Sequence, residues 1–392
     1  MHQPEPDARP RVLHLTQPVD GGVARVVTDL TRAQLAAGLH VTVACPPAGR
    51  LAGDLRSLGA DVRHWAASRS PGPSLPGEVR RLVRLLDEVR PDLVHAHSAK
   101  AGLAGRLAVR GRIPTVFQPH AWSFEAVGGT TAALALTWER FGARWTDRLV
   151  CVSEAERTTG LRARIGGQVS VIPNGIDPER FHPASVDTVR ASLLPELDPA
   201  APLVVCVGRL CRQKGQDVLL TAWTDIARKV PGARLVLVGD GPDGERLRAR
   251  TPESVLFTGS VADAVPWYQA ADLVVLPSRW EGMALAPLEA LACGRPVVVT
   301  DVDGARESLP RALAPRCLVP AENPAALAGA IAGLLLDPLL RESLGHQGRR
   351  HVLTTHDVRR TAEAVVGVYR ELLTTTQGAR VAPTECRESI HS

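Results

Sequence analysis

Short apolar runs alternate with longer amphipathic stretches along most of the chain, a pattern typical of strands that alternate with helices. In the first half, apolar runs predict buried strands at residues 11–15, 41–45, 61–65, 91–97, 113–117 and 147–153. Helical periodicity separates them, at residues 24–37, 51–58, 78–89, 99–109 and 131–145. The alternation restarts with strands at 203–207, 234–238, 255–259, 272–277 and 295–300. Such a series predicts parallel sheets with helices on both faces.

The length of 392 residues and the interruption between the two series predict two domains. We expect a first domain at residues 11–172, a linker at 173–183 and a second domain at 184–354, with a further helix at 355–373. The Pro-rich segment 1–10 and the tail 374–392 are expected to be disordered. The predicted fold class is therefore α/β, with two facing doubly wound domains and a cleft between them.

One loop and short helix in the second domain carry two glutamates. Glu281 follows the strand at 272–277, and Glu289 lies in the first turn of a helix that Pro287 would begin and Gly294 would end. Ligands bind where loops leave the carboxyl ends of parallel strands. In one interpretation Glu289 only complements the helix dipole and Glu281 is solvated. In the other, both accept hydrogen bonds from ligand hydroxyls while free helix N–H groups face a phosphate.

Two other strand-to-helix loops carry groups that suit an anion. Gly208 would admit a close approach, and Arg209 and Lys214 would supply positive charge for a diphosphate. Solvation at the surface is the ordinary alternative for such charges. After the first strand, Gly21 and Gly22 would let backbone N–H groups approach an anion, although a plain tight turn explains them equally well.

Three histidines lie in or just after predicted strands. A lone histidine such as His120, which follows the strand at 113–117, is usually structural. His95 and His97 lie within the strand at 91–97, and because side chains alternate along a strand we expect them to face opposite sides of the sheet. This expectation argues against a shared metal site, and it leaves one histidine for the core and the other for ligand contact.

The residues around the two glutamates resemble a known signature. Segment 277–298 (PSRWEGMALAPLEALACGRPVV) is similar to the glutamate-seven-glutamate motif of retaining nucleotide-sugar glycosyltransferases of family four, which have the GT-B fold. Further matches are PDLVHAHS at 91–98, IPNGID at 172–177 and GRLCRQKG at 208–215, so the resemblance covers about residues 11–373. One departure is Met283, which stands where the family usually has an aromatic residue.

The resemblance implies Rossmann-like domains, with the acceptor beside the first, the nucleotide sugar in the second, and a terminal helix that crosses back to the first. Arg209 and Lys214 would neutralise the leaving diphosphate together with backbone N–H groups at the helix start. Glu281 would hold sugar hydroxyls, Glu289 would accept hydrogen bonds from the ribose, and His120 would lie beside the anomeric carbon. The donor-binding positions that the resemblance implies are Gly21, Gly22, Gly208, Arg209, Lys214, Val261, Gly282, Met283, Ala284, Leu285 and Glu289.

The implied reaction moves a sugar from a nucleotide diphosphate, such as a UDP- or GDP-sugar, with retention at the anomeric carbon and with no cofactor or metal. Asp301 and Asp303 resemble a metal clamp, but we reject this interpretation because the family has a Gly-rich loop with a glutamate there, matched by Gly304 and Glu307. A non-catalytic nucleotide-sugar binder with the same fold is the alternative. Against it, every charged position of the motifs is filled.

Charge is distributed unevenly along the chain. Residues 1–190 contain 24 lysines and arginines against 18 aspartates and glutamates, and the remainder contains 22 against 23. A basic first domain favours an anionic partner, although an arginine-rich genome would give the same excess. We therefore expect a lipid-linked glycan acceptor in surface polysaccharide synthesis, with a small soluble acceptor (a natural product or thiol precursor) as the alternative, and no nucleic acid. The arginines expected to face the inner leaflet of the membrane are Arg80, Arg81, Arg84, Arg106, Arg110 and Arg112.

Cysteine usage and the terminus bear on the compartment. The seven cysteines form no C-x-x-C pair and several lie in apolar runs, as in reduced cytosolic proteins. The first residues, MHQPEPD, do not resemble a signal peptide, and no apolar run reaches the roughly 18 residues of a membrane span. We expect a cytoplasmic protein whose contact with the membrane, if any, is peripheral.

Overall fold

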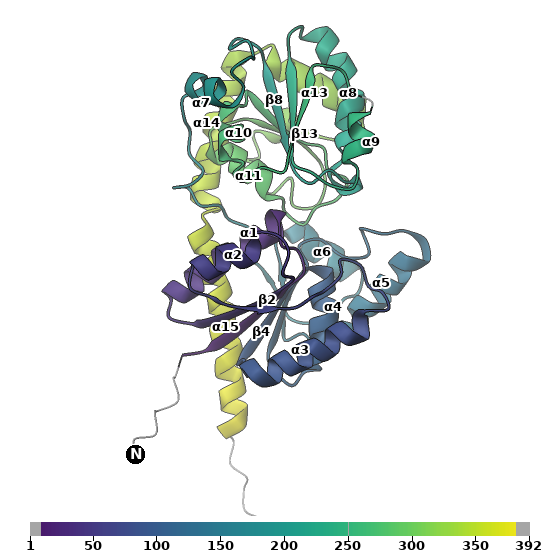
Figure 1. The fold of residues 1–392 in the computed structure, drawn as a ribbon, viewed down its shortest axis with the longest axis vertical. Helices are drawn as coiled ribbons and strands as arrows, with labels where there is room; N and C mark the ends of the chain where they lie inside the picture. Colours follow the sequence, from purple (N-terminus) through teal and green to yellow (C-terminus); the bar gives the residue numbers. More distant parts are fainter. Residues whose placement is uncertain (1–8, 250, 382–392) are drawn as a thin grey trace, which may run out of the picture.

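The computed structural model describes residues 9–249 and 251–381, which form two parallel sheets covered by helices (Figure 1). The seven-stranded sheet has the order β3-β2-β1-β4-β5-β6-β7, and the six-stranded sheet has the order β10-β9-β8-β11-β12-β13. All neighbouring strands in both sheets run parallel. The predicted α/β class with two doubly wound sheets is confirmed. Below, each sheet with its helices is called the N-terminal or the C-terminal domain.

The elements of the N-terminal domain follow the predicted alternation closely. Its strands are β1 (Arg11–Thr16), β2 (His40–Cys45), β3 (Asp61–His64), β4 (Leu93–His97), β5 (Thr115–Gln118), β6 (Arg148–Cys151) and β7 (Val169–Val171). Its helices are α1 (Gly21–Ala36), α2 (Leu51–Ser57), α3 (Leu75–Val89), α4 (Ser98–Val109), α5 (Gly129–Gly142), the 3-10 helix η1 (Ala143–Trp145) and α6 (Glu154–Arg162).

The C-terminal domain repeats this alternation. Its strands are β8 (Leu203–Val207), β9 (Arg234–Val238), β10 (Val255–Gly259), β11 (Leu273–Leu276), β12 (Val297–Thr300) and β13 (Leu318–Val319). Its helices are α7 (Val186–Leu193), the 3-10 helix η2 (Arg212–Lys214), α8 (Gln216–Lys229), α9 (Gly244–Arg248), α10 (Val265–Ala270), α11 (Leu285–Ala292), α12 (Ala314–Cys317), α13 (Pro324–Leu335) and α14 (Pro338–Thr355), and a last helix, α15 (Val358–Val381), follows.

The central strands are buried on both faces, which explains their continuous apolar sequences. Every residue of β4, β5, β11 and β12 is buried. A parallel sheet lies between two layers of helices, so its inner strands have no solvent-facing side and need not alternate polar with apolar residues.

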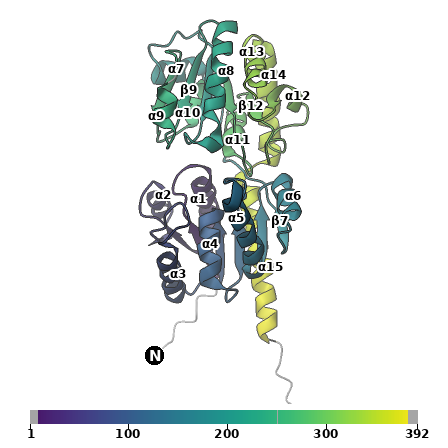
Figure 2. The same ribbon diagram turned by 90° about the vertical axis from the view of Figure 1, so that its right-hand side faces the viewer.

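The strand order of each sheet reverses once, between β1 and β4 in one domain and between β8 and β11 in the other. A crevice opens at such a reversal, outside the carboxyl ends of the strands. Figures 1 and 2 show α1 and α6 at the end of the N-terminal domain nearest the other domain, and α11 at the facing end of the C-terminal domain. The loops that carry most of the predicted site residues therefore face each other between the domains.

Helix α15 connects the domains a second time by returning along the N-terminal domain, where it contacts α1 (Figure 1). At its start, the N–H of Ile176 donates to the carbonyl of His356 at 2.8 Å and the N–H of Val358 donates to that of Ile176 at 3.0 Å. Gly175 fits beside this crossing because a Cβ there would lie 2.6 Å from the backbone of Val358.

The expected end of the last helix at Leu373 is wrong, and so is the expectation of disorder immediately after it. Helix α15 continues to Val381. The hydroxyls of Thr374 and Thr375 donate to the carbonyls of Arg370 and Glu371 at 2.8 Å, so these threonines add hydrogen bonds within the helix. The remaining expected disorder, at residues 1–8 and 382–392, lies outside the described residues.

Arg106 does not face a membrane as we expected. Its side chain is 1% exposed and pairs with Glu139 of α5 at 2.6 Å. Its guanidinium also lies 4.0 Å from the ring centroid of Phe117. Because the amphipathic pattern of α4 is weak, charge alone did not reveal that this arginine points inward. The other five arginines of the expected surface are exposed.

Within the described part of the chain, no single helix is long and apolar enough to span a membrane, and one bent pair, α13 with α14, meets that test by length and composition only.

Candidate active site

The loop between β11 and α11 places Glu281 against Lys214, which follows β8. The Nζ of Lys214 lies 2.5 Å from Oε1 of Glu281, and the hydroxyl of Ser278 donates to the same oxygen at 2.7 Å. Both side chains are largely buried. Two residues that the sequence assigned to different ligand groups, a sugar and a diphosphate, therefore form one ion pair, so both ligand groups would have to bind at the same point.

Helix α11 begins at Leu285, two residues before the predicted start, so the first-turn position expected for Glu289 is wrong. Proline fits anywhere in a first helical turn because those N–H groups have no partner within the helix, so Pro287 did not fix the start. Glu289 is half-buried in the next turn and accepts a hydrogen bond from the Tyr268 hydroxyl at 2.6 Å. Burial raises the pKa of Glu289, and the hydrogen bond from Tyr268 opposes this effect.

Two helix N-termini meet in the cleft. Helix α1 begins at Gly21, not after the glycines as expected, and Gly21 has a φ of +77° that favours glycine. A Cβ on Gly22 would lie 3.8 Å from Cδ1 of Leu285, the first residue of α11. Each N-terminus exposes free N–H groups and the positive end of a helix dipole, so the pair forms a site that attracts an anion.

Arg209 adds positive charge to this region. It is half-buried in the loop after β8, and within the described residues its guanidinium makes no hydrogen bond or ion pair. Gln216 donates to the carbonyl of Arg209 at 3.1 Å, which fixes the loop. Arg69, from the loop after β3, comes from the other domain, and burial together with repulsion from Arg209 lowers the pKa of Arg69. Two arginines from different domains therefore lie close enough to repel each other.

His120 lies in a constrained loop after β5. His120 and Ala121 have φ values of +59° and +116°, a backbone conformation that non-glycine residues rarely adopt. The buried carboxylate of Glu156 holds the loop, because it accepts from the N–H groups of Ala121 and Val152 at 2.7 Å each. Burial lowers the pKa of His120 to about 3, so its imidazole is neutral at physiological pH.

The loop of His120 touches the loop of Glu281 directly. A Cβ on Gly282 would lie 2.9 Å from the carbonyl carbon of His120 and from the backbone nitrogen of Ala121. Asn174 donates to the carbonyl of Met283 at 2.7 Å, and the Ser153 hydroxyl donates to that of Gly282 at 3.0 Å. The structure thus brings the predicted residues of both domains together in a closed arrangement.

The expectation that His95 and His97 face opposite sides of the sheet is wrong. Both are fully buried and their ring centroids are 3.9 Å apart, because residues two positions apart on a strand share a face. His14 of β1 joins them, and one ring nitrogen from each of the three lies within 4.8 Å of the others. Strand alternation therefore gives no argument against a shared metal site.

The loop after β12 binds the N-terminal domain. Glu307 accepts from the N–H groups of Glu154 and Ala155, the first residues of α6, at 2.8 and 2.9 Å. Asp303 accepts from the Thr159 hydroxyl at 2.8 Å. Asp301 instead pairs with Arg306, so the two aspartates engage different partners.

Two further predicted positions lie in loops of the C-terminal domain. Gly208 contacts the stem of Lys214, since a Cβ there would lie 3.7 Å from it. Val261 is half-buried in the loop after β10, and the guanidinium of Arg50 donates to the neighbouring carbonyl of Ala262 at 2.5 Å, from the opposite domain.

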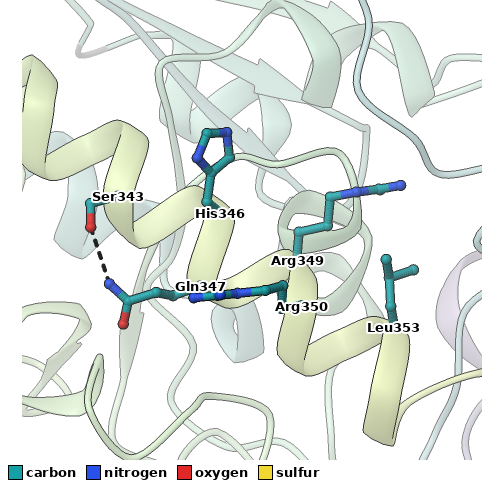
Figure 3. Close-up of a pocket in the computed structure, with 6 residues that line it drawn as sticks. All are labelled: Ser343, His346, Gln347, Arg349, Arg350 and Leu353. Carbon is teal, nitrogen blue, oxygen red and sulfur yellow. Dashed lines mark hydrogen bonds between the residues drawn. The ribbon is translucent and has the colours of Figure 1, made fainter.

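One hollow in the described residues lies away from this site. It has a volume of about 530 Å³ beside α14 and is lined by Ser343, His346, Gln347, Arg349, Arg350 and Leu353 (Figure 3). All six side chains come from one helix, and none is a predicted site residue. Behind Glu281 there is a cavity of only about 10 Å³, room for at most one water.

Several residues of the site escaped sequence reasoning. Arg69 and Tyr268 belong to no motif that we examined. Glu156 does have a local signal, because Ser153 and Glu156 have the spacing of a capping box and the Ser153 hydroxyl accepts from the Glu156 N–H at 3.0 Å. That signal predicts the start of α6, but it does not predict that the carboxylate reaches the loop of His120.

Comparison with known proteins gives consistent results for both halves of the chain. Residues 20–180 match the family model described as Glycosyltransferase Family 4, and residues 201–337 match the model described as Glycosyl transferases group 1. A D-inositol 3-phosphate glycosyltransferase from Actinosynnema mirum is 31% identical over 396 residues, which covers 89% of this chain and 92% of that protein.

A second relative is the UDP-Gal:alpha-D-GlcNAc-diphosphoundecaprenol alpha-1,3-galactosyltransferase of Escherichia coli. It is 33% identical over 236 residues, covering 57% of this chain and 61% of that protein. Among solved structures, Anabaena HepE in complex with UDP-glucose superimposes with a TM-score of 0.78 at 23% identity, covering 92% of this chain and 99% of that one. The chain therefore belongs to family four of the glycosyltransferases and has the GT-B fold.

Proposed function

We propose that the protein is a retaining glycosyltransferase that moves a sugar from a nucleotide diphosphate to an acceptor without a bound metal. The observation that carries this proposal is the meeting of two helix N-termini, those of α1 and α11, beside the loop in which Glu281 pairs with Lys214. Such a site stabilises the negative charge that develops on a departing diphosphate. HepE, which shares the fold, binds UDP-glucose, and this supports a nucleotide-sugar donor.

The assigned roles follow from position. Arg209, Lys214 and the N–H groups of residues 283–285 neutralise the diphosphate, with the N-terminus of α1 on the opposite side. Glu289, half-buried beside Tyr268, accepts hydrogen bonds from the ribose. Glu281 holds sugar hydroxyls, and Val261 lies where the base binds. Because Lys214 and Glu281 pair with each other in the closed arrangement, we infer that the domains separate for the donor to enter.

The proposal that the anomeric configuration is retained rests on His120 and Glu281. His120 is neutral, and its lowered pKa makes it unsuited to proton transfer near pH 7. Glu281 is paired with Lys214 and lies on the donor side. The proposal is therefore transfer on one face of the sugar through an ion-pair-like state, which needs charge stabilisation more than a nucleophile.

Two substitutions test the diphosphate assignment. Arg209→Ala and Lys214→Ala should each cost about 2–4 kcal/mol of transition-state stabilisation, because each removes a preorganised positive charge. The measurement is kcat/KM with the nucleotide sugar that a screen by hydrolysis and thermal shift identifies. The matched control is Arg228→Ala, at an exposed position far along α8. Turnover within about threefold of wild type for both site variants would reject the assignment.

Metal independence is tested by chelation. Two basic side chains and two helix N-termini already supply the positive potential that a metal would give. Activity should therefore be unchanged in EDTA. If EDTA abolishes turnover and Mn²⁺ or Mg²⁺ restores it, Asp301 and Asp303 become candidate ligands and the metal-free proposal fails.

For the acceptor, we propose a lipid-linked glycan of surface polysaccharide synthesis. The Escherichia coli relative is named for a diphosphoundecaprenol acceptor, and the Actinosynnema relative for a soluble inositol phosphate, so the alternative is a small soluble acceptor. Both named acceptors carry phosphate, which suits the positive charges of Arg69 and Arg209. We place the enzyme in the cytoplasm, in peripheral contact with the inner leaflet.

A further inference from the structure

Three histidines form a continuous chain of hydrogen bonds behind the cleft. Nε2 of His120 lies 3.1 Å from Nδ1 of His97, and Nε2 of His97 lies 2.9 Å from Nδ1 of His14. The far nitrogen of His14 contacts Oε1 of Gln34 at 2.7 Å. His14, His97 and Gln34 are fully buried, so no solvent competes for these hydrogen bonds. The side chain of His120 is therefore connected to the core of the N-terminal domain.

The chain ends on the helix that crosses between the domains. The amide of Gln34 donates to the Tyr369 hydroxyl at 3.3 Å, and that hydroxyl lies 2.6 Å from Nδ1 of His95. Tyr369 belongs to α15 and Gln34 to α1, which pack together. The network thus rests on two helices and two strands, all of them rigid elements, so it can fix an orientation.

Two separate contacts hold His120. Its backbone loop is fixed by Glu156, which accepts from the Ala121 N–H, and its ring is fixed by His97. Since Nε2 of His120 is used by His97, the ring nitrogen left for a ligand is Nδ1. Burial lowers the pKa of His97 well below the ordinary value, so both rings are neutral and each carries a single N–H. The carbonyl oxygen of Gln34 can only accept, so Nε2 of His14 donates to it and Nδ1 of His14 accepts from Nε2 of His97. Nδ1 of His97 is then an acceptor, so Nε2 of His120 carries the proton and its Nδ1 is left unprotonated.

We propose that His97 is a positioning residue, which orients the ring of His120 and sets its tautomer toward the donor sugar. This inference rests on the proposed glycosyl transfer and on the place that the family resemblance implies for His120, beside the anomeric carbon. Nothing in the motif match distinguishes His97 from a core residue, and the assignment comes from the 3.1 Å contact and the buried chain behind it.

A shared metal ion is the competing explanation for His14, His95 and His97, and the spacing disfavours it. Two nitrogens at 2.0–2.1 Å from one tetrahedral zinc ion would be separated by about 3.3 Å. The two nitrogens of His14 and His97 are 2.9 Å apart, the ordinary length of a hydrogen bond. Burial lowers the pKa of His95 well below its ordinary value, and the interaction with Gln118 opposes this effect.

The test uses two substitutions that each keep one half of the His97 contacts. An asparagine amide can occupy the position of Nδ1, which faces His120, and a glutamine amide can occupy the position of Nε2, which faces His14. His97→Asn should keep kcat within about threefold of wild type, whereas His97→Gln should lower kcat by about 100-fold, the cost of a misplaced group. The KM for the donor should change little in either variant.

Thermal unfolding of the full-length variants separates positioning from stability. The proposal expects similar melting temperatures for the two variants and different kcat values. Equal losses of kcat, or losses that follow the melting temperature, would overturn it in favour of a purely structural role. A stoichiometric metal in the purified enzyme would also overturn it. A third variant, His120→Ala, separates the role of His120 from the positioning role of His97. If His120→Ala has normal activity, the role of His120 is rejected. If His120→Ala loses most activity while His97→Gln keeps normal activity, only the positioning role of His97 is rejected.

Discussion

Gly282 occupies the point where the backbones of the two domains touch. A Cβ there would lie 2.9 Å from the carbonyl carbon of His120, the nitrogen of Ala121 and Cγ2 of Val152, closer than real Cβ atoms approach other groups. Behind it, Gly304 has a φ of +73°, and a Cβ there would overlap the Gly282 carbonyl oxygen. These glycines therefore permit the closed arrangement, and they do so at the loop that carries Glu281.

We predict that Gly282→Ala lowers kcat by at least about tenfold while changing the melting temperature much less, because the clash exists only when the domains close. Steady-state kinetics and thermal unfolding measure the two effects. Gly53→Ala in α2 is the matched control, since a Cβ there meets nothing within 4 Å. Wild-type kcat in Gly282→Ala would mean that catalysis does not require this contact.

At the scale of single residues, the sequence could predict several site residues but not which of their side chains are in contact. Motif positions identified Lys214 and Glu281 separately, and only the fold reveals their 2.5 Å pairing. His95 and His97 were assigned to opposite faces although strand geometry places such residues together. Arg69 lies in a loop whose sequence has neither a periodic pattern nor a motif, so nothing in the sequence indicates that this charged residue is functional.

Among the elements, α4 and α5 are joined by a buried ion pair. Arg106 and Glu139 are each 1% exposed, Arg106 donates to the Gly102 carbonyl at 2.7 Å, and Glu139 also accepts from the Ser123 hydroxyl at 2.9 Å. Ser123 follows the loop of His120, so the pair supports the approach to the site as well as the packing of the two helices.

We predict that Arg106→Leu destabilises the protein by about 3–5 kcal/mol, because it leaves the carboxylate of Glu139 buried without its partner. Chemical denaturation measures this cost. Arg110→Leu, at the exposed end of the same helix, should stay within about 0.5 kcal/mol of wild type. Replacing both members, Arg106→Leu with Glu139→Leu, should recover part of the loss. No loss in the single variant would contradict the burial of the pair.

The sequence predicted the existence of the elements better than their ends. Continuous apolar runs located the central strands because a sheet buried on both faces leaves no other pattern. Helix ends were less certain where the local signals are permissive: Pro287 fits any position of the first turn of α11, and Gly21 and Gly22 lie inside the start of α1. Between the predicted end at Leu373 and Gly378 the sequence has no proline or glycine that would stop α15.

On the scale of the whole molecule, the repeated alternation of strands and helices predicts two doubly wound sheets. It does not predict the contacts that bring the two domains together. Closure depends on contacts that pair residues more than 100 positions apart, such as Glu307 with the start of α6 and Asn174 with Met283. Asn174, Met283 and Glu307 each lie at a motif position, but the motifs do not indicate which residues pair. A linear pattern carries no record of such pairings, so the closed cleft could be found only from the structure.

The remaining whole-molecule question is which surface meets an acceptor at the membrane. Helices α3 and α4 pack side by side in the N-terminal domain (Figure 2), and five of the six arginines proposed for this surface are exposed on them or just beyond α4. These are Arg80, Arg81, Arg84, Arg110 and Arg112. Each basic residue near an anionic bilayer contributes about 1 kcal/mol, an effect that salt screens.

We predict that the enzyme sediments with anionic liposomes at low salt, less so at high salt, and not with neutral liposomes. Replacing these five arginines by glutamine should abolish sedimentation. The control replaces five exposed arginines of the C-terminal domain, Arg228, Arg246, Arg248, Arg311 and Arg316, which changes the net charge equally. If both quintuple variants lose binding alike, net charge is the cause and the proposed surface is rejected. Absence of binding by the wild type at either salt would instead favour a soluble acceptor, because a lipid-linked one requires contact with the bilayer.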